Sequence, residues 1–279
     1  MSWNPEKTLD AVRECVRNIS EHRGSCHWDL KSDKSLVTDI DKSNEAILRK
    51  ALEKDGDLFL GEESVSGITK EYFHEIIEGT AYIVDPIDGT APFAHRLPLW
   101  AISVGYSEKG LITNGCIALP DLNEAYISNG DDVLFSRDVN APLQDWKKLQ
   151  RPSEKWSEGA MLITGQDFTK RHLLNFKNPV LVPGSAVQSF SALLSGKVIA
   201  YIGHMKLWDI AGSISLLRRM GFSVRLLRNG QEFKGEISDD FFVLDFASDR
   251  LWAFNSDLVS TMPANHPYVN ELLAREKQI

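Results

Sequence analysis

Apolar residues recur every three or four positions in several segments of the chain, and this spacing predicts amphipathic helices. In 5–22, for example, Leu9, Val12, Val16 and Ile19 fall on one helical face. The predicted helices are 5–22, 41–54, 69–78, 185–195 and 209–220, with a weaker pattern over 256–262 and 266–277. Helices are therefore expected along the whole chain, with other elements between them.

Short apolar runs bounded by turn residues predict the strands. Residues 58–60 run into Gly61-Glu62-Glu63-Ser64, and residues 81–84 stop at Asp85-Pro86, because proline disfavours further pairing. The other predicted strands are 99–107, 111–119 and 123–128, which form an antiparallel meander, followed by 161–163, 198–202 and 222–227. Two predicted strands thus deliver carboxylates at their ends.

The succession of elements changes near residue 150. Before it, helices and a meander predict an α+β unit over 1–150, and after it alternating strands and helices predict an α/β unit over 151–279. The segment 137–158 is polar and contains proline, a composition typical of a junction between domains. The pattern predicts an α+β fold class with two units.

The composition is that of an ordinary globular protein. Of the 279 residues, 43% are hydrophobic and 25% are charged, which favours neither disorder nor a membrane protein. A formal net charge of −8 argues against nucleic acid or anionic lipid as a partner. Three scattered cysteines, an N-terminus unlike a leader and the absence of an apolar run of about 18 residues predict a cytoplasmic protein without a membrane anchor.

The segment Asp85-Pro86-Ile87-Asp88-Gly89-Thr90 concentrates the candidate chemistry. Proline keeps it out of regular helix or central strand, so both carboxylates are free to turn toward one point. Mg²⁺ takes carboxylate, carbonyl and water oxygens, and the Ile87 carbonyl offers a further ligand. Gly89 permits a tight turn, and Thr90 adds a hydroxyl. A lone segment of this type also fits an Asx-type turn with solvated acids.

Covalent catalysis has little support in the sequence. Haloacid-dehalogenase-type phosphatases also use an aspartate-rich segment that ends in Gly-Thr, but their motif spaces the aspartates two apart, and Pro86 stands at that position here. The chain contains neither a GxxxxGK[ST] phosphate loop nor a GxSxG elbow. An activated water is therefore the expected nucleophile.

Several motifs occur together in an order that resembles the inositol monophosphatase family. These motifs are Leu36-Val37-Thr38 followed by Asp41, Gly61-Glu62-Glu63-Ser64, Asp85 to Thr90, Gly184-Ser185-Ala186, and Trp208-Asp209-Ile210-Ala211-Gly212. The family belongs to a lithium-sensitive, magnesium-dependent superfamily that includes fructose-bisphosphatases. The resemblance implies a layered α-β-α-β-α sandwich, hydrolysis of a phosphomonoester and a homodimer.

The resemblance also implies a metal site. Its ligands are expected to be the side chains of Glu62, Asp85, Asp88 and Asp209 and the Ile87 carbonyl, around two or three Mg²⁺ ions. Physical chemistry agrees, because four converging carboxylates repel one another unless cations neutralise them. Asp209 also fits as a residue that opens a helix, where the helix dipole favours a carboxylate. Capping and metal binding are compatible roles.

The implied catalytic residues are Thr90, Asp41 and Glu63. Thr90 is expected to hydrogen-bond the attacking water and to be oriented by Asp41, while Glu63 supports the same region. The alternative for Asp41 and Thr38 is capping of the helix 41–54. Substrate contacts are expected from the Gly89 and Thr90 backbone N–H groups and from Gly184, Ser185 and Ala186.

The sequence departs from inositol-specific members at three positions. Ile202 stands where those members have a substrate-contacting glutamate, Leu181 replaces an arginine, and Pro92 replaces an asparagine. Lys206 could pair with a second anionic group or could be a solvated surface lysine. The expected substrate is a small sugar, polyol or amino-alcohol phosphate.

Other activities stay open at this stage. Within the superfamily they are those of a histidinol-phosphatase, a 3′-nucleotidase and a fructose-bisphosphatase. From another class, a regulatory binding protein could share the fold and act through a macromolecular partner. The retained carboxylate cluster favours the enzyme, because a site freed from catalysis has no need of repelling acids.

Overall fold

The computed structural model describes residues 3–31, 35–54, 56–153, 156–172 and 176–276. Its helices are α1 (Pro5–His22), α2 (Asp39–Leu52), α3 (Lys70–Glu78), α4 (Thr90–Ala94), α5 (Gln166–Arg171), α6 (Ala186–Leu194), α7 (Leu207–Arg219) and α8 (His266–Glu276). Its strands are β1 (Trp28–Leu30), β2 (Leu36–Thr38), β3 (Leu58–Gly61), β4 (Thr80–Asp88), β5 (Ala101–Glu108), β6 (Leu111–Leu119), β7 (Glu124–Asn129), β8 (Asp132–Ser136), β9 (Lys147–Lys148), β10 (Leu162–Thr164), β11 (Val180–Leu181), β12 (Ala200–Gly203), β13 (Ser223–Leu226), β14 (Glu232–Phe233) and β15 (Leu258–Thr261).

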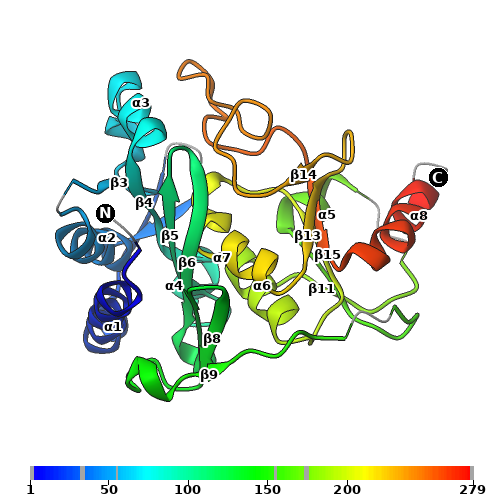
Figure 1. The fold of residues 1–279 in the computed structure, drawn as a ribbon, viewed down its shortest axis with the longest axis horizontal. Helices are drawn as coiled ribbons and strands as arrows, with labels where there is room; N and C mark the ends of the chain where they lie inside the picture. Colours follow the sequence, from blue (N-terminus) through cyan, green and yellow to red (C-terminus); the bar gives the residue numbers. More distant parts are fainter. Residues whose placement is uncertain (1–2, 32–34, 55, 154–155, 173–175, 277–279) are drawn as a thin grey trace.

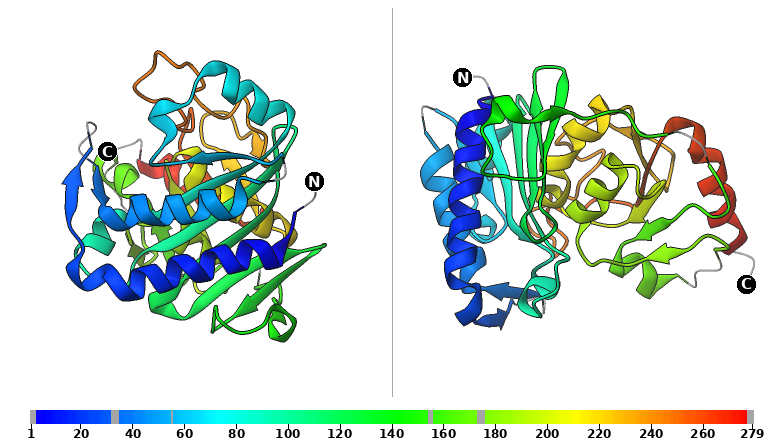
Figure 2. Two further views of the ribbon diagram at one scale, coloured as in Figure 1. Left: turned by 90° about the vertical axis from the view of Figure 1, so that its left-hand side faces the viewer. Right: turned by 90° about the horizontal axis from the view of Figure 1, so that it is seen from below.

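Two large sheets alternate with helical layers, as expected for an α+β sandwich (Figure 1). The first sheet has the order β3-β4-β5-β6-β7-β8-β9, and the second has the order β11-β10-β12-β15-β13-β14. Helices α1 and α2 cover the outer face of the first sheet, α6 and α7 lie between the sheets, and α8 lies beyond the second sheet (Figures 1 and 2). The predicted α+β layered fold is confirmed.

Three apolar clusters fill the spaces between these layers. One lies between α1, α2 and the first sheet, and a small one lies outside the second sheet around Phe168 and Val269. The largest joins the first sheet, α6, α7 and the second sheet, so it contains residues from both sides of residue 150. The division into units 1–150 and 151–279 stays a prediction.

Helix α7 packs unusually close to the first sheet. A methyl group added at Gly115 would come within 2.2 Å of the Gly212 carbonyl oxygen, so a side chain at this crossing would push the helix away. Ser103 fixes the approach: its hydroxyl donates to the Trp208 carbonyl at 3.0 Å and accepts from the Gly212 N–H at 3.2 Å. The start of α7, with Asp209, is therefore held against the strands that carry the other acids.

Most predicted elements are present, including the meander, which β5, β6 and β7 form in antiparallel register. The predicted end of the strand at Asp85-Pro86 is wrong, because β4 continues to Asp88. Its pairing with β5 shifts register between Asp85 and Asp88, so Pro86 lies in a bulge where the regular ladder is already interrupted.

The predicted helix 256–262 is also wrong. Residues 258–261 form β15, which pairs with β12 on one side and β13 on the other. All four side chains are buried, and this central position in the sheet decides the conformation. The predicted helix 266–277 corresponds to α8, and residue 277 lies outside the described residues.

Several short elements were not predicted. They include β1 and β2, which pair with each other, and the strands β8, β9, β11 and β14. Within the described part of the chain, no helix combines the length and apolar character needed to cross a bilayer.

Candidate active site

Three elements bring their acids to one point. Glu62 follows β3, Asp85 lies in β4, and Asp209 lies in the first turn of α7. Strands β3 and β4 are parallel neighbours, and the Glu62 N–H donates to the Val84 carbonyl, which brings the two strand ends together. One carboxylate oxygen from each acid lies within 4.8 Å of the other two. We call Glu62, Asp85 and Asp209 the acidic cluster.

Burial and mutual repulsion act on the same groups. Burial raises the pKa of Asp85 well above its ordinary value, and the neighbouring carboxylates of Glu62, Asp88, Asp209 and Asp41 raise it further. Burial likewise raises the pKa of Asp209, followed by the charges of Asp88 and Glu62. A hard divalent cation removes this repulsion, and an all-oxygen donor set is what Mg²⁺ requires. The residues present therefore fit a magnesium site.

Asp88 is oriented differently from the acidic cluster. One carboxylate oxygen accepts from the Ser185 hydroxyl and from the Val187 N–H at 2.8 Å, and the other accepts from the Ala186 N–H at 3.3 Å. Burial raises the pKa of Asp88 to about 6, although these hydrogen bonds lower it. Asp88 thus joins the Asp85 segment to the start of α6, the position of the Gly184-Ser185-Ala186 motif.

Asp41 and Thr90 meet as expected. The Thr90 hydroxyl lies 3.0 Å from Asp41 Oδ1 and 3.1 Å from the Ile87 carbonyl oxygen, and its single proton serves one of them at a time. Asp41 Oδ2 accepts from the Thr38 hydroxyl and from the Thr38 N–H at 2.9 Å. Thr38 also caps α2, so capping and orientation of Thr90 coexist. Burial raises the pKa of Asp41 to about 6.

Lys31 is a member of this site that sequence reasoning missed. Its ammonium group lies 3.0 Å from Glu62 Oε1 and 2.7 Å from Glu63 Oε1. Burial lowers the pKa of Lys31, but Glu62 and Glu63 outweigh it and the net shift is upward. Burial and Glu62 raise the pKa of Glu63 to about 7. No spacing signal marked Lys31, because it lies in a loop after β1, far along the chain from these glutamates.

Glu45 on α2 also supports the Glu62–Glu63 turn. Its carboxylate accepts from the Glu63 N–H at 2.7 Å. A side chain at Gly61 would come within 2.3 Å of the Glu45 carboxylate, so glycine leaves the space that this contact needs. The helical pattern of 41–54 placed Glu45 on a helix but gave no sign of this role.

The turn after Asp88 depends on glycine. Gly89 has φ of +89°, a conformation that L side chains rarely adopt, and a side chain there would meet the Leu99 carbonyl oxygen at 2.8 Å. This turn starts α4 at Thr90 and places its hydroxyl toward Asp41.

A cavity of about 150 Å³ lies beside the acids. We call it the site cavity. Its lining includes Asp88, Asp209, Gly184, Ser185, Ala186 and His204. It is small and largely polar, so it suits a phosphate group with a small polar alcohol better than an apolar ligand.

Residues on β12 and just after it differ in whether they line the site cavity. Tyr201 lines the site cavity, whereas Ile202 is buried in the apolar cluster outside the second sheet, because successive strand residues face opposite sides. Ile202 therefore does not occupy a substrate-facing position. Lys206 is not among the described residues that line the site cavity; its ammonium group lies 5.4 Å from the Trp208 ring centroid, and its N–H donates to Asp209 at 2.8 Å.

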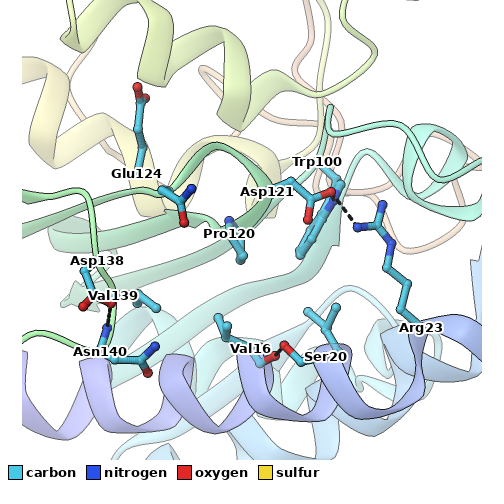
Figure 3. Close-up of a pocket in the computed structure, with 12 residues that line it drawn as sticks. Val16, Ser20, Arg23, Trp100, Pro120, Asp121, Glu124, Asp138, Val139 and Asn140 are labelled. Carbon is cyan, nitrogen blue, oxygen red and sulfur yellow. Dashed lines mark hydrogen bonds and ion pairs between the residues drawn. The ribbon is translucent and has the colours of Figure 1, made fainter.

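A second cavity, of about 350 Å³, lies between α1 and the turn that joins β6 to β7 (Figure 3). We call it the N-terminal cavity. Asp121 accepts from Arg23 at 2.5 Å and from the Trp100 indole N–H at 2.8 Å, and the Arg23 guanidinium lies over the Trp100 ring. The Asp121 charge at this end of the cavity is therefore matched by hydrogen-bond donors.

Comparison with known proteins identifies the same family that the motifs resemble. Residues 7–262 match the model of the inositol monophosphatase family. The chain is 30% identical over 227 residues to inositol monophosphatase 2 of Saccharomyces cerevisiae, covering 73% of this chain and 74% of that protein.

Solved structures share the fold. The IMPase of Thermotoga maritima has a TM-score of 0.72 at 21% identity, covering 97% of this chain and 96% of that one. An IMPase/NADP phosphatase complexed with Mg²⁺ and phosphate has a TM-score of 0.68 at 18% identity, covering 95% and 92% of the two chains. The chain belongs to the inositol monophosphatase family and is a phosphoric monoester hydrolase.

Proposed function

We propose that the protein hydrolyses a small phosphomonoester by a Mg²⁺-dependent attack of water. The observation that carries the proposal is the acidic cluster, whose carboxylate oxygens lie within 4.8 Å of one another beside a polar cavity of about 150 Å³. Like charges gathered around a buried carboxylate are costly in a folded protein, and a cation site explains their presence. The solved relative that binds Mg²⁺ and phosphate supports the same interpretation.

The metal ligands in this proposal are Glu62, Asp85, Asp88, Asp209 and the Ile87 carbonyl, around two or three ions. Glu62, Asp85 and Asp209 are already gathered. Asp88 contributes through the oxygen that accepts the longer hydrogen bond, 3.3 Å from the Ala186 N–H. When bound, Mg²⁺ lowers the pKa of water and neutralises developing charge on the phosphate and the leaving oxygen.

Thr90 positions the water in this proposal. When its hydroxyl donates to Asp41, its oxygen lone pairs are available to accept a hydrogen bond from water. Asp41 is in turn held by two hydrogen bonds from Thr38, so its carboxylate is fixed as an acceptor for Thr90. Glu63, which pairs with Lys31, supports the Glu62 side of the site.

The substrate's phosphate is proposed to bind against the turn at Gly89 and Thr90 and the start of α6 at Gly184, Ser185 and Ala186. The remaining walls of the site cavity include Thr164, Gln166 and His204, which suit the hydroxyl or amino groups of a sugar, polyol or amino alcohol. A preference for inositol phosphate is not part of the proposal.

Three further proposed properties rest only on membership of the family. They are inhibition by lithium, a homodimeric state and a location in the cytoplasm. Each is separable from the chemistry, so the failure of one would leave the proposed reaction intact.

A phosphate-release screen tests the proposed function. Purified protein, first treated with EDTA, is assayed on sugar, polyol and amino-alcohol phosphates with and without added Mg²⁺. We expect turnover of at least one compound with Mg²⁺, loss of that turnover in EDTA, and inhibition by lithium. Turnover that persists without divalent metal would contradict the mechanism, and inactivity on the whole panel would favour a regulatory role.

A further inference from the structure

A larger cavity, of about 560 Å³, adjoins the site cavity. The two share Asp167 and His204 among their lining residues, so a molecule bound in one cavity lies next to the other. We call the larger one the basic cavity. It is formed by α5, the start of the segment after β12, and the loop between β14 and β15.

Positive charge exceeds negative charge on its walls. Lys170, Arg171 and Arg250 are permanent cations, against the carboxylates of Asp167 and Asp257. Burial lowers the pKa of His204, which disfavours its charged form. This local excess stands out in a chain with a formal charge of −8 and directly beside the acidic cluster. A cation would therefore prefer the acidic cluster, and an anion would prefer the basic cavity.

Arg171 is held in a fixed position. Its two terminal nitrogens donate to Asp257 at 2.9 and 2.5 Å, and its Nε donates to the Asp167 carbonyl at 3.1 Å. These three bonds use three of the five guanidinium N–H groups, so two remain for a ligand on an already ordered side chain. Preorganisation of this kind reduces the entropy lost when an anion binds.

Arg250 supplies a second guanidinium with fewer protein contacts. It is exposed, and one terminal nitrogen donates weakly to the Phe254 carbonyl at 3.4 Å. Lys170 lies 3.6 Å from Asp167 on the exposed rim. An anion in this cavity would thus meet one fixed guanidinium, one adaptable guanidinium and one ammonium group.

We propose that the basic cavity binds a second anionic group of the substrate, so that the preferred substrates are phosphomonoesters that also carry a carboxylate or a second phosphate. The inference rests on the proposed function, because it requires the phosphate that is cleaved to lie in the site cavity. Bidentate donation by arginine suits both carboxylate and phosphate, so the two anions share the recognition chemistry.

Matched substrate pairs test the inference. 3-Phosphoglycerate and glycerol 3-phosphate differ by a carboxylate in place of a hydroxymethyl group. Fructose 1,6-bisphosphate is paired with the monophosphate that keeps the phosphate that is cleaved, either fructose 1-phosphate or fructose 6-phosphate, so that the pair differs only by the second phosphate. For wild-type protein with Mg²⁺, we expect kcat/KM to be about 10-fold higher for the doubly anionic member of at least one pair, as one charge-assisted contact allows. The pair that shows the preference identifies the anion.

Arg250→Gln is the informative variant, because Arg171 substitutions would leave Asp257 without its bidentate partner. We expect Arg250→Gln to reduce kcat/KM about 10-fold for the doubly anionic substrate and less than 2-fold for its matched partner, mainly through KM. Arg250→Lys keeps the charge and should lose less than about 3-fold. Arg17→Gln, which changes an exposed arginine on α1, should leave both substrates unaffected.

The outcomes separate this inference from the proposed function. Turnover of the singly anionic substrates with no preference in either pair, or equal losses for both members in Arg250→Gln, would overturn the inference alone. Absence of Mg²⁺-dependent turnover of every substrate would overturn both. A thermal unfolding midpoint for each variant equal to that of the wild type establishes that the kinetic change is local.

Discussion

The acidic cluster and the N-terminal cavity each place a carboxylate among close polar neighbours, but the neighbours of Asp85 are other acids and those of Asp121 are hydrogen-bond donors. Asp121 in the N-terminal cavity accepts from Arg23 and from the Trp100 indole, so its charge is matched by donors (Figure 3). Asp85 in the acidic cluster is surrounded by other carboxylates, which raise its pKa together with burial.

The contrast separates the proposed metal site from a structural ion pair. Paired charges hold segments together, as Arg23 and Asp121 join the end of α1 to the turn after β6. Carboxylates that repel one another destabilise the metal-free protein, and a bound cation relieves that repulsion. Such a cluster is therefore expected where a protein binds a metal ion. Cavity volume does not identify the proposed active site, because the N-terminal cavity, at about 350 Å³, is larger than the site cavity, at about 150 Å³.

Equivalent substitutions in the two regions should have opposite consequences. Asp85→Asn should lower kcat for Mg²⁺-dependent phosphate release by about 1,000-fold or more, because it removes a charge from the metal ligands. Asp121→Asn should leave kcat within about 3-fold and lower the free energy of unfolding by less than about 1 kcal/mol, because the solvent-accessible Arg23–Asp121 pair loses its charge attraction but keeps an acceptor oxygen.

Steady-state kinetics and denaturant unfolding on both variants check this pair of expectations. The comparison fails if Asp121→Asn costs as much activity as Asp85→Asn, or if Asp85→Asn retains most of its turnover.

Removing a single hydroxyl group from each region tests the same comparison with a smaller expected effect. Thr90→Ala should lower kcat about 100-fold, because the water loses a hydrogen-bond partner that Asp41 orients. Thr90→Ser keeps the hydroxyl and should stay within about 5-fold of wild type. Ser20→Ala removes a hydroxyl from the N-terminal cavity and is the matched control, expected to leave kcat unchanged. Equal kcat values for the alanine and serine variants of Thr90 would remove Thr90 from the mechanism.

The smallest expected effect concerns stability and pH. The folded pKa values of Asp41 and Glu63 rise to about 6 and about 7, from ordinary values of 3.8 and 4.5, and that of Asp85 also rises. The folded state then binds more protons than the unfolded state, so this contribution to the free energy of unfolding falls as pH rises from about 4 to about 7. In EDTA, wild-type protein should therefore lose stability relative to Asp85→Asn as pH rises.

Thermal unfolding of both proteins between pH 5 and pH 8 measures this effect. We expect the Tm of Asp85→Asn in EDTA to exceed that of wild type by about 3–5 °C at pH 8, with a smaller gap at pH 5. Mg²⁺ should raise the wild-type Tm most at the higher pH, because its ligands must be deprotonated. A gap that is constant with pH would show that the folded protein does not raise the pKa of Asp85.

The sequence predicted the elements whose pattern is strong and local. The helical spacing of α1 and the apolar runs of β5, β6 and β7 were enough to predict these elements. The apolar residues that form the buried face of each element lie within the element itself. Residues 258–261 show the limit: their conformation depends on pairing with β12 and β13, which the local pattern does not contain.

Part of the candidate site followed from motif order, and part did not. The motifs gathered Glu62, Asp85 and Asp209, and they paired Asp41 with Thr90. Lys31 and Glu45 escaped detection, because their contacts join segments that are distant along the chain. The motifs also could not predict that Asp88 points toward α6. That orientation depends on the tertiary contact between the Asp88 segment and the start of α6.

A crystal soaked in Mn²⁺ offers the most direct test of the central claim. Mn²⁺ prefers oxygen ligands as Mg²⁺ does, and its anomalous scattering locates the ion without assumptions about activity. We expect an anomalous peak among the carboxylates of Glu62, Asp85 and Asp209, and no peak there in Asp85→Asn. A peak at another place, or none in wild-type crystals at millimolar Mn²⁺, would contradict the assignment of the acidic cluster as the metal centre.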